Sequence, residues 1–299
     1  MNALEAFEKE IYYQEEEIPR ILSDIKSIND DICIFTGAGD SYAAALEAVY
    51  VSGHKARFID PLELSLKPSL AKDSNLYIIS ISGSTKANIE AAKATKGLCK
   101  RIAITANPNS KLAQICDDII ELRYKHLGIL TAGSIGFTAS LLAAISVISK
   151  LEVNDDIKSI FRRAERDADI TLKAHIYTIG SYETYPLSIY ATAKIYEVLG
   201  FKAQYAMLEQ FCHMELFSLS NNDTVLLLSD LEKAQELYDK LDCNKYIFKK
   251  YNTSMLDNIL YYIFLIQLIV LKNAKILGLS DCHFVENEAI RSISSSLIY

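Results

Sequence analysis

The 299-residue sequence lacks several features that mark whole classes of protein. It has no CxxC pair, and its six cysteines are widely spaced, which indicates reduced, mostly buried thiols in a cytoplasmic protein. It has no excess of basic residues, and its formal charge of -7 argues against a nucleic-acid surface as the main function. Half of the residues are hydrophobic, so we expect a folded globular protein. Its 299 residues are enough for two domains of ordinary size.

Long apolar runs are also missing. The longest, residues 259–271, is too short to span a bilayer, contains Gln267 and fits a buried helix. The N-terminal segment is acidic and amphipathic, which is not the pattern of a secretory signal peptide. We therefore expect neither a membrane nor a nucleic acid among the partners.

Strand-like and helix-like segments alternate in the first half of the chain, which predicts a parallel, doubly wound α/β sheet. The expected strands are residues 32–36, 56–59, 76–79, 101–105 and 118–122. The expected helices are residues 3–28, an Ala-rich segment ending near 52, residues 86–96 and residues 131–151.

The same alternation then starts again, so two α/β halves are expected, residues 1–153 and 154–299. A charged stretch, residues 154–169, is expected to join them. The second-half strands are expected at residues 175–179, 203–205, 224–228 and 246–249. The second-half helices are expected at residues 185–199, 209–216, 231–241 and 254–276, followed by a tail.

The most informative turn lies between the strand at 76–79 and the helix at 86–96. It contains four hydroxyl residues and one glycine, namely Ser80, Ser82, Gly83, Ser84 and Thr85. The first N–H groups of a helix have no internal partner and carry partial positive charge, so an anion such as phosphate is stabilised there. Glycine lets the backbone approach a ligand closely. The alternative is an ordinary Ser/Thr N-cap, which needs only one hydroxyl.

A second loop with glycine and hydroxyl groups, residues 37–42, follows the strand at 32–36. Ligands of doubly wound sheets bind beyond the C-terminal ends of the strands, so the two loops are expected at one site. The matching loop of the second half has no glycine and carries Asp230, whose charge would repel a phosphate. The anion site is therefore expected in the first half only.

These two loops resemble those of the sugar isomerase (SIS) domain family. Residues 36–42, TGAGDSY, match its first loop, commonly G-x-G-x-S, and residues 80–85, SISGST, match its second, S-x-S-G-x-T. The resemblance implies two tandem flavodoxin-like domains, each a three-layer αβα sandwich. It also implies phosphate contacts from Ser41, Ser80, Ser82 and Thr85, with Gly39 and Gly83 permitting the close approach.

The second half resembles the same family, in particular the isomerase domain of glucosamine-6-phosphate synthases. Within residues 191–197, ATAKIYE, Lys194 and Glu197 match the K-x-x-E part of the pattern A-x-K-x-x-E of the helix that carries the catalytic glutamate, and His213 stands sixteen residues after Glu197, where the family has a histidine. The resemblance implies Glu197 as the base, Lys194 as an electrostatic or structural partner, and His213 as the acid/base that opens the sugar ring. The family histidine usually reaches into a neighbouring subunit, which implies a homodimer with composite sites.

From the residues alone, purely structural interpretations of these side chains stay open. Lys194 and Glu197 are spaced i, i+3 on a helix and could form a surface ion pair. His213, between Cys212 and Met214, could be a core or interface histidine. Aldose–ketose interconversion does need such groups, because a carboxylate can carry the proton between C1 and C2 on both sides of an enediol step. A bound phosphate would hold those carbons against the base.

The sequence also departs from the family pattern. Arg291 stands where the family tail has a Schiff-base lysine, and an arginine stays protonated, although it could hold a substrate oxygen or carboxylate. The loop at residues 131–136 lacks the common glutamate, and Asn2 stands where the synthases have a nucleophilic cysteine. We expect an isomerase of hexose or amino-hexose 6-phosphates that uses no metal and no cofactor. A glucosamine-6-phosphate deaminase and a non-catalytic sugar-phosphate regulator are the alternatives.

Overall fold

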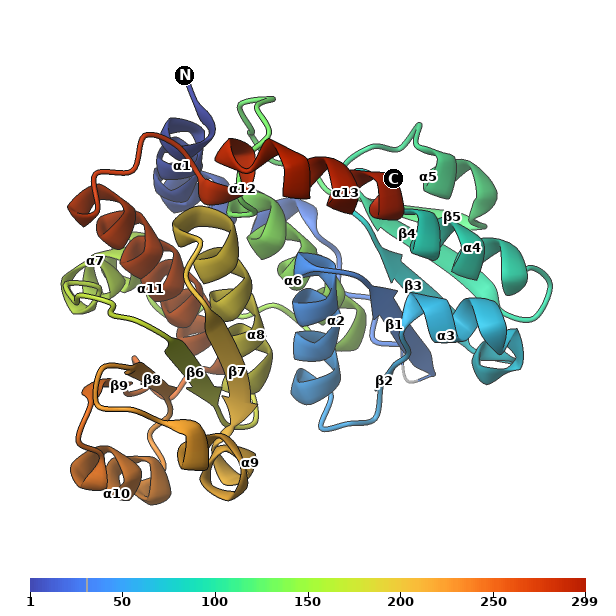
Figure 1. Ribbon diagram of the computed structural model, residues 1–299. Helices are drawn as coiled ribbons and strands as arrows, with labels where there is room; N and C mark the ends of the chain where they lie inside the picture. The colour runs from blue at the N-terminus through green and yellow to red at the C-terminus, as the bar shows by residue number, and fades with distance from the viewer. Residues whose placement is uncertain (31) are drawn as a thin grey trace. The chain divides into compact units, whose positions relative to one another are not determined.

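A computed structural model describes residues 1–30 and 32–299 of the chain (Figure 1). They form two compact units, each with its own parallel sheet. The five-strand unit consists of residues 16–126, 135–151 and 288–299, and the four-strand unit of residues 1–15, 127–134 and 152–287. The predicted α/β class with parallel sheets is confirmed.

The sheet of the five-strand unit has the strand order β2-β1-β3-β4-β5, with every neighbouring pair parallel. This 2-1-3-4-5 order is that of flavodoxin-like sheets, whose ligands bind at the switch point between β1 and β3. The strands are β1 (Cys33–Gly37), β2 (Arg57–Phe58), β3 (Asn75–Ile79), β4 (Lys100–Thr105) and β5 (Asp118–Glu121).

Helices cover both faces of this sheet (Figure 1). Ile34, Leu76, Ile78 and Ala103 alternate along three strands and pack against one group of helices, whereas α2 and α6 pack together on the other face. The first group is α3 (Pro61–Leu66), η1 (Pro68–Ala71), α4 (Lys86–Ala94) and α5 (Lys111–Ile115). The remaining helices are α2 (Asp40–Val51), α6 (Ile135–Ile148) and the C-terminal α13 (Glu288–Ile298).

The sheet of the four-strand unit has the order β7-β6-β8-β9, again all parallel. Its strands are β6 (Ile176–Gly180), β7 (Ala203–Met207), β8 (Thr224–Leu228) and β9 (Asn244–Phe248). Alternate residues such as Tyr177 and Val225 face α9 and α10 in one hydrophobic cluster, and α8 and α11 pack on the other face. The order repeats positions 2-1-3-4 of the first sheet.

The helices of the four-strand unit are α7 (Ile157–Asp167), α8 (Thr184–Lys194), the π-helical turn η2 (Ile195–Leu199), α9 (Leu208–His213), η3 (Glu215–Ser218), α10 (Glu232–Lys240), α11 (Met255–Ile276) and α12 (His283–Glu286). The long N-terminal helix α1 (Ala3–Asp24) begins in this unit and ends in the other. By length and composition α11 could cross a membrane, but 83% of its apolar window is buried, as expected for a core helix.

The prediction that the charged residues 154–169 only join the two halves is wrong, because they belong to the four-strand unit. Residues 157–167 form α7, whose side chains Ile157, Ile160, Phe161 and Ala164 are buried against its own unit. Asp156 caps the helix by accepting a hydrogen bond from the Ser159 N–H. The many charged residues occupy the opposite face, and this charge hid the helical spacing of the apolar ones.

Several helix boundaries in the structure also differ from the predicted ones. The helix expected at 3–28 ends at Asp24, and the chain then runs along α6, where the Ile28 N–H donates to the Ser146 carbonyl. The helix expected at 131–151 begins only at Ile135, and the tail expected after residue 276 contains α12 and α13. The short helices α3 and α5 were not predicted at all, because pieces of this length have little periodicity to recognise.

Phe161→Ala tests the packed α7. The Phe161 side chain is 1% exposed, with ring centroids 5.4 Å from Tyr12 and 5.1 Å from Phe264. We expect this truncation to lower the free energy of unfolding by about 3–5 kcal/mol, measured by urea denaturation. Arg162→Ala, on the exposed face, should change it by less than about 0.5 kcal/mol. Equal, small effects of both variants would contradict the packing described.

Candidate functional site

The candidate anion site lies where β1 and β3 end together. Gly37 is the register partner of Ile79, so the loops that follow the two strands start side by side at the C-terminal edge of the sheet. The first loop leads through Gly39, at φ 62°, into α2, and Ser41 is buried in the first turn of that helix. This edge is the switch point at which flavodoxin-like sheets bind ligands.

The second loop, residues 80–85, is folded by its own backbone and hydroxyl groups. The Gly83 N–H donates to the Ser80 carbonyl at 3.0 Å. The hydroxyls pair with one another, Ser80 with Thr85 at 3.3 Å and Ser82 with Ser84 at 2.7 Å. The four hydroxyl groups are therefore held in one small turn.

Neither adjoining helix carries a side-chain cap. The Thr85 side chain, just before α4, does not bond to the first turn of that helix, and Gly39, just before α2, has no side chain with which to cap it. The interpretation of residues 80–85 as an ordinary Ser/Thr N-cap is therefore wrong. Two neighbouring helix N-termini form a stronger anion site than one.

Gly83 is the glycine on which the second loop depends. It has φ 62°, a conformation that other residues rarely adopt. A Cβ placed here would lie 2.0 Å from the Ser110 hydroxyl oxygen, and that hydroxyl caps α5 by accepting from the Ala113 N–H. The loop, the α5 cap and the end of β4 thus share one tightly packed corner.

Charged groups at the two loops are few. Asp40 lies in the first loop and Lys86 begins α4 after the second. The Lys86 ammonium donates to the Ser296 carbonyl at 2.7 Å, so it also holds α13. Arg291, one and a half turns earlier on α13, is half-buried in the same unit.

The equivalent loops of the four-strand unit are closed by internal bonds. The Ser181 N–H donates to the Thr184 hydroxyl at 2.8 Å, and that hydroxyl lies within hydrogen-bond distance of the Ser181 and Leu228 carbonyls. Asp230 follows β8, as the sequence predicted. These contacts favour placing the anion site in the five-strand unit.

Lys194 and Glu197 form an ion pair at the C-terminal end of the α8–η2 helix. The Lys194 side chain is 0% exposed, whereas that of Glu197 is 35% exposed. The simple surface-pair interpretation is therefore wrong, since one partner is fully buried. An ammonium this close favours the ionised carboxylate, which is the form that accepts a proton.

The end of this helix is held by α12. Gly200, at φ 67°, ends the π-helical turn, and a Cβ there would meet the His283 ring at 2.5 Å. Cys282, just before α12, lies within electrostatic range of Lys194 and Glu197, and burial raises the pKa of its thiol to about 12. The thiol is therefore neutral beside the ion pair.

His213 lies far from Glu197 within one chain. The η2 turn ends just before β7, and His213 ends the short helix that follows β7, so about 16 Å of extended strand separates the two sites. The His213 side chain is 69% exposed and lies 3.1 Å from Glu209. Lys233 first, and His213 second, lower the pKa of the Glu209 carboxyl through hydrogen bonds. The core interpretation of His213 is wrong; the interface interpretation stays a prediction.

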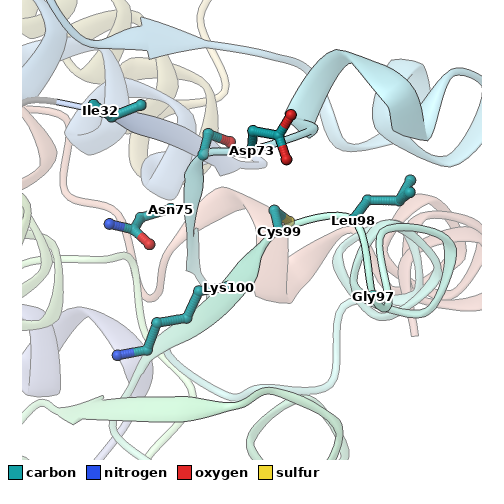
Figure 2. Close-up of a pocket in the computed structure, with 8 residues that line it drawn as sticks. Ile32, Asp73, Asn75, Gly97, Leu98, Cys99 and Lys100 are labelled. Atoms are coloured by element: carbon teal, nitrogen blue, oxygen red, sulfur yellow. The ribbon is translucent and has the colours of Figure 1, made fainter.

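An open hollow lies at the opposite edge of the five-strand sheet. Figure 2 shows Asn75 at the start of β3, Lys100 at the start of β4 and Cys99 just before it. The candidate loops follow the C-terminal ends of β1 and β3, whereas the hollow lies at the starts of β3 and β4, so the hollow is separate from the anion site. Within residues 1–30 and 32–299, no group of three or more His, Cys, Asp or Glu side chains is placed to hold a metal ion.

The sequence missed the groups that surround the ion pair. The Tyr190 ring lies beneath Lys194, with the ammonium 5.2 Å from the ring centroid. Its position four residues before Lys194 on one helix was the available signal, but core tyrosines have the same spacing.

No protein-family model and no curated protein matches the sequence. The fold matches solved structures over most of both chains. The C-terminal domain of glucosamine-fructose-6-phosphate aminotransferase from Francisella tularensis is 18% identical, with TM-score 0.71 over 91% of this chain and 96% of that one. Glucosamine-6-phosphate deaminase from Thermotoga maritima is 18% identical, with TM-score 0.73 over 93% and 96%.

Tagatose-6-phosphate ketose/aldose isomerase from Escherichia coli is 16% identical, with TM-score 0.72 over 91% of this chain and 93% of that one. At such identities the likeness establishes the fold. The resemblance to sugar isomerase proteins drawn from the loop and helix motifs is thus confirmed at the level of the fold.

Gly83→Ala tests the anion site. The added Cβ and the positive φ force the loop away from Ser110, so we expect inorganic phosphate to bind roughly tenfold more weakly or worse, measured by isothermal titration calorimetry. Gly97→Ala is the matched control, because Gly97 also has a positive φ of 78° but nothing lies within 4 Å of its Cβ position. Native phosphate affinity in Gly83→Ala would contradict the site.

Proposed function

We propose that the chain is a phosphosugar isomerase that interconverts ketose and aldose forms of hexose or amino-hexose 6-phosphates. The observation that carries this proposal is the pair of uncapped helix N-termini at the ends of β1 and β3, which suits a phosphate monoester. The fold shared with a tagatose-6-phosphate isomerase supports it. In this proposal the chain consists of two tandem SIS domains, residues 1–153 and 154–299, and acts in the cytoplasm.

The phosphate would be anchored by the first half. Backbone N–H groups of the two loops, with Ser41, Ser80, Ser82 and Thr85, would donate hydrogen bonds to its oxygens, while Gly39 and Gly83 allow the close approach. The positive φ angles of these two glycines support this role. Anchoring at the phosphate leaves C1 and C2 free to meet a base.

Glu197 would be that base. Its carboxylate, kept ionised by Lys194, would take the proton from one carbon and return it to the other through an enediol. Arg291 would hold a substrate oxygen. The partial exposure of Glu197 beside a buried ammonium supports this role, because the carboxylate stays reachable while its charge is compensated.

His213 would open the sugar ring from a second copy of the chain. Within one chain it is separated from Glu197 by the whole of β7, and its side chain is 69% exposed. Both facts support a homodimer in which each site takes Glu197 from one subunit and His213 from the partner. A two-fold dimer would form two such sites.

The direct test compares Glu197→Gln with the native protein. We expect the variant to lose isomerisation of fructose 6-phosphate or its amino-sugar counterpart by roughly 100-fold or more, because the amide cannot accept the proton. The sugar phosphate should still raise Tm in a thermal-shift assay, since the anchor is intact. Unchanged turnover in Glu197→Gln would contradict Glu197 as the base.

Subunit mixing tests the composite site. Glu197→Gln and His213→Ala should each be inactive alone. Refolded together, half of the dimers should be mixed, and each mixed dimer should hold one intact site, so about a quarter of native activity should return. Mixtures that stay inactive, when each variant is also inactive alone, would show that both residues must come from the same chain.

The second candidate function is a glucosamine-6-phosphate deaminase, favoured by the fold shared with the Thermotoga maritima enzyme. It would use the same glutamate and histidine but release ammonia. We expect no ammonia from glucosamine 6-phosphate in a coupled assay, while isomerisation proceeds. Release of one ammonia for each glucosamine 6-phosphate consumed would contradict the isomerase proposal and support the deaminase.

A further inference from the structure

Four polar side chains of the four-strand unit are completely buried along a single path. They are Gln14 on α1, Gln267 on α11, and Tyr190 and Lys194 on α8, each 0% exposed. Burying amides, a phenol and an ammonium is costly unless each finds a partner. The partners that these groups find lead to Glu197.

The path is hydrogen-bonded at every step up to the tyrosine. The Gln14 side-chain amide donates to the Gln267 carbonyl oxygen at 2.6 Å. The Gln267 amide donates to the Tyr190 hydroxyl at 2.9 Å. That hydroxyl in turn donates to the Gly133 carbonyl at 2.7 Å. Because the hydroxyl both accepts and donates, the tyrosine ring is fixed in one orientation.

The fixed ring then meets the ion pair. The Lys194 ammonium lies 5.2 Å from the Tyr190 ring centroid and also pairs with Glu197. A cation over an aromatic face is attracted to it, and more strongly when water is excluded. The ring therefore restrains an ammonium that would otherwise have several rotamers.

We propose that Tyr190 is a positioning residue for Glu197, acting through Lys194. Its hydroxyl fixes the ring, the ring holds the ammonium, and the ammonium keeps the carboxylate ionised and in one place. The catalytic meaning of this arrangement rests on the proposed isomerase function, but the arrangement itself needs no substrate. Both can therefore be tested separately.

The segment around α12 brings further titratable groups near the pair. Cys282 is neutral because burial raises the pKa of its thiol to about 12, and Asp281 lies within electrostatic range of that thiol. His283 lies over Gly200 at the helix end. The side chain that α11 brings to the path, Gln267, is uncharged.

The test is an NMR titration of the Glu197 carboxyl carbon in 13C-labelled full-length protein without substrate. Tyr190→Leu removes the ring, so Lys194 is freed and the ionised carboxylate is less favoured. We expect Glu197 to become protonated at a pH roughly one unit higher than in the native protein. Tyr190→Phe keeps the ring but loses its hydrogen bonds, and should shift the titration upward by roughly a third of a unit.

Tyr196→Phe is the matched control. Tyr196 lies on the same helix, and its hydroxyl bonds to the Ala203 carbonyl rather than to the path. In the Tyr196→Phe variant, the titration curve of the Glu197 carboxyl should coincide with that in the native protein. A merely structural role of Tyr190 would lower Tm without moving the Glu197 titration.

Native-like titration of Glu197 in folded Tyr190→Leu would overturn the proposal. If the Tyr190→Leu variant does not fold, the Tyr190→Phe variant provides the test. An unshifted Glu197 titration in Tyr190→Phe would then overturn the proposal. The acid limb of the isomerisation rate should move with the same titration. If native protein isomerises no sugar phosphate, the proposed function fails, while a shifted titration would still establish the positioning role.

Discussion

The structure depends first on the parallel register of β1 and β3. Because the two strands end together, at Gly37 and Ile79, two helices start from neighbouring points of one sheet edge. Each helix brings N–H groups that its preceding residue does not cap, and their partial positive charges add at the same place. Serine and threonine hydroxyls and two glycines at positive φ lie at this corner, where we propose that an anion binds.

A second constraint is the buried ammonium of Lys194. A fully buried charge costs several kcal/mol unless a partner compensates it, and Glu197 is that partner. The compensation makes Glu197 more than a surface carboxylate, because removing it would take away the carboxylate that is paired with a buried ammonium. The tyrosine and two glutamines behind Lys194 explain how the four-strand unit tolerates a charge in its core.

Much of the fold could be predicted from the sequence because buried parallel strands are short apolar runs and the long helices are strongly periodic. The helix α7 could not, because its four buried apolar residues stand among charged ones. At the site, the hydroxyl-rich turn was visible, but the contact between Gly83 and Ser110 joins residues far apart in the chain. The strand between Glu197 and His213 was predicted at residues 203–205, but their spacing of sixteen residues does not by itself show that the length of β7 separates them in space.

The central claim is that a sugar phosphate held at this corner exchanges a carbon-bound proton. The most direct measurement is deuterium incorporation from D2O into fructose 6-phosphate and related hexose phosphates incubated with native protein, followed by NMR. The account predicts deuterium at C1 or C2, suppressed by competing inorganic phosphate. Binding of these sugars without any deuterium at either carbon would contradict it and would identify the chain as a sugar-phosphate sensor.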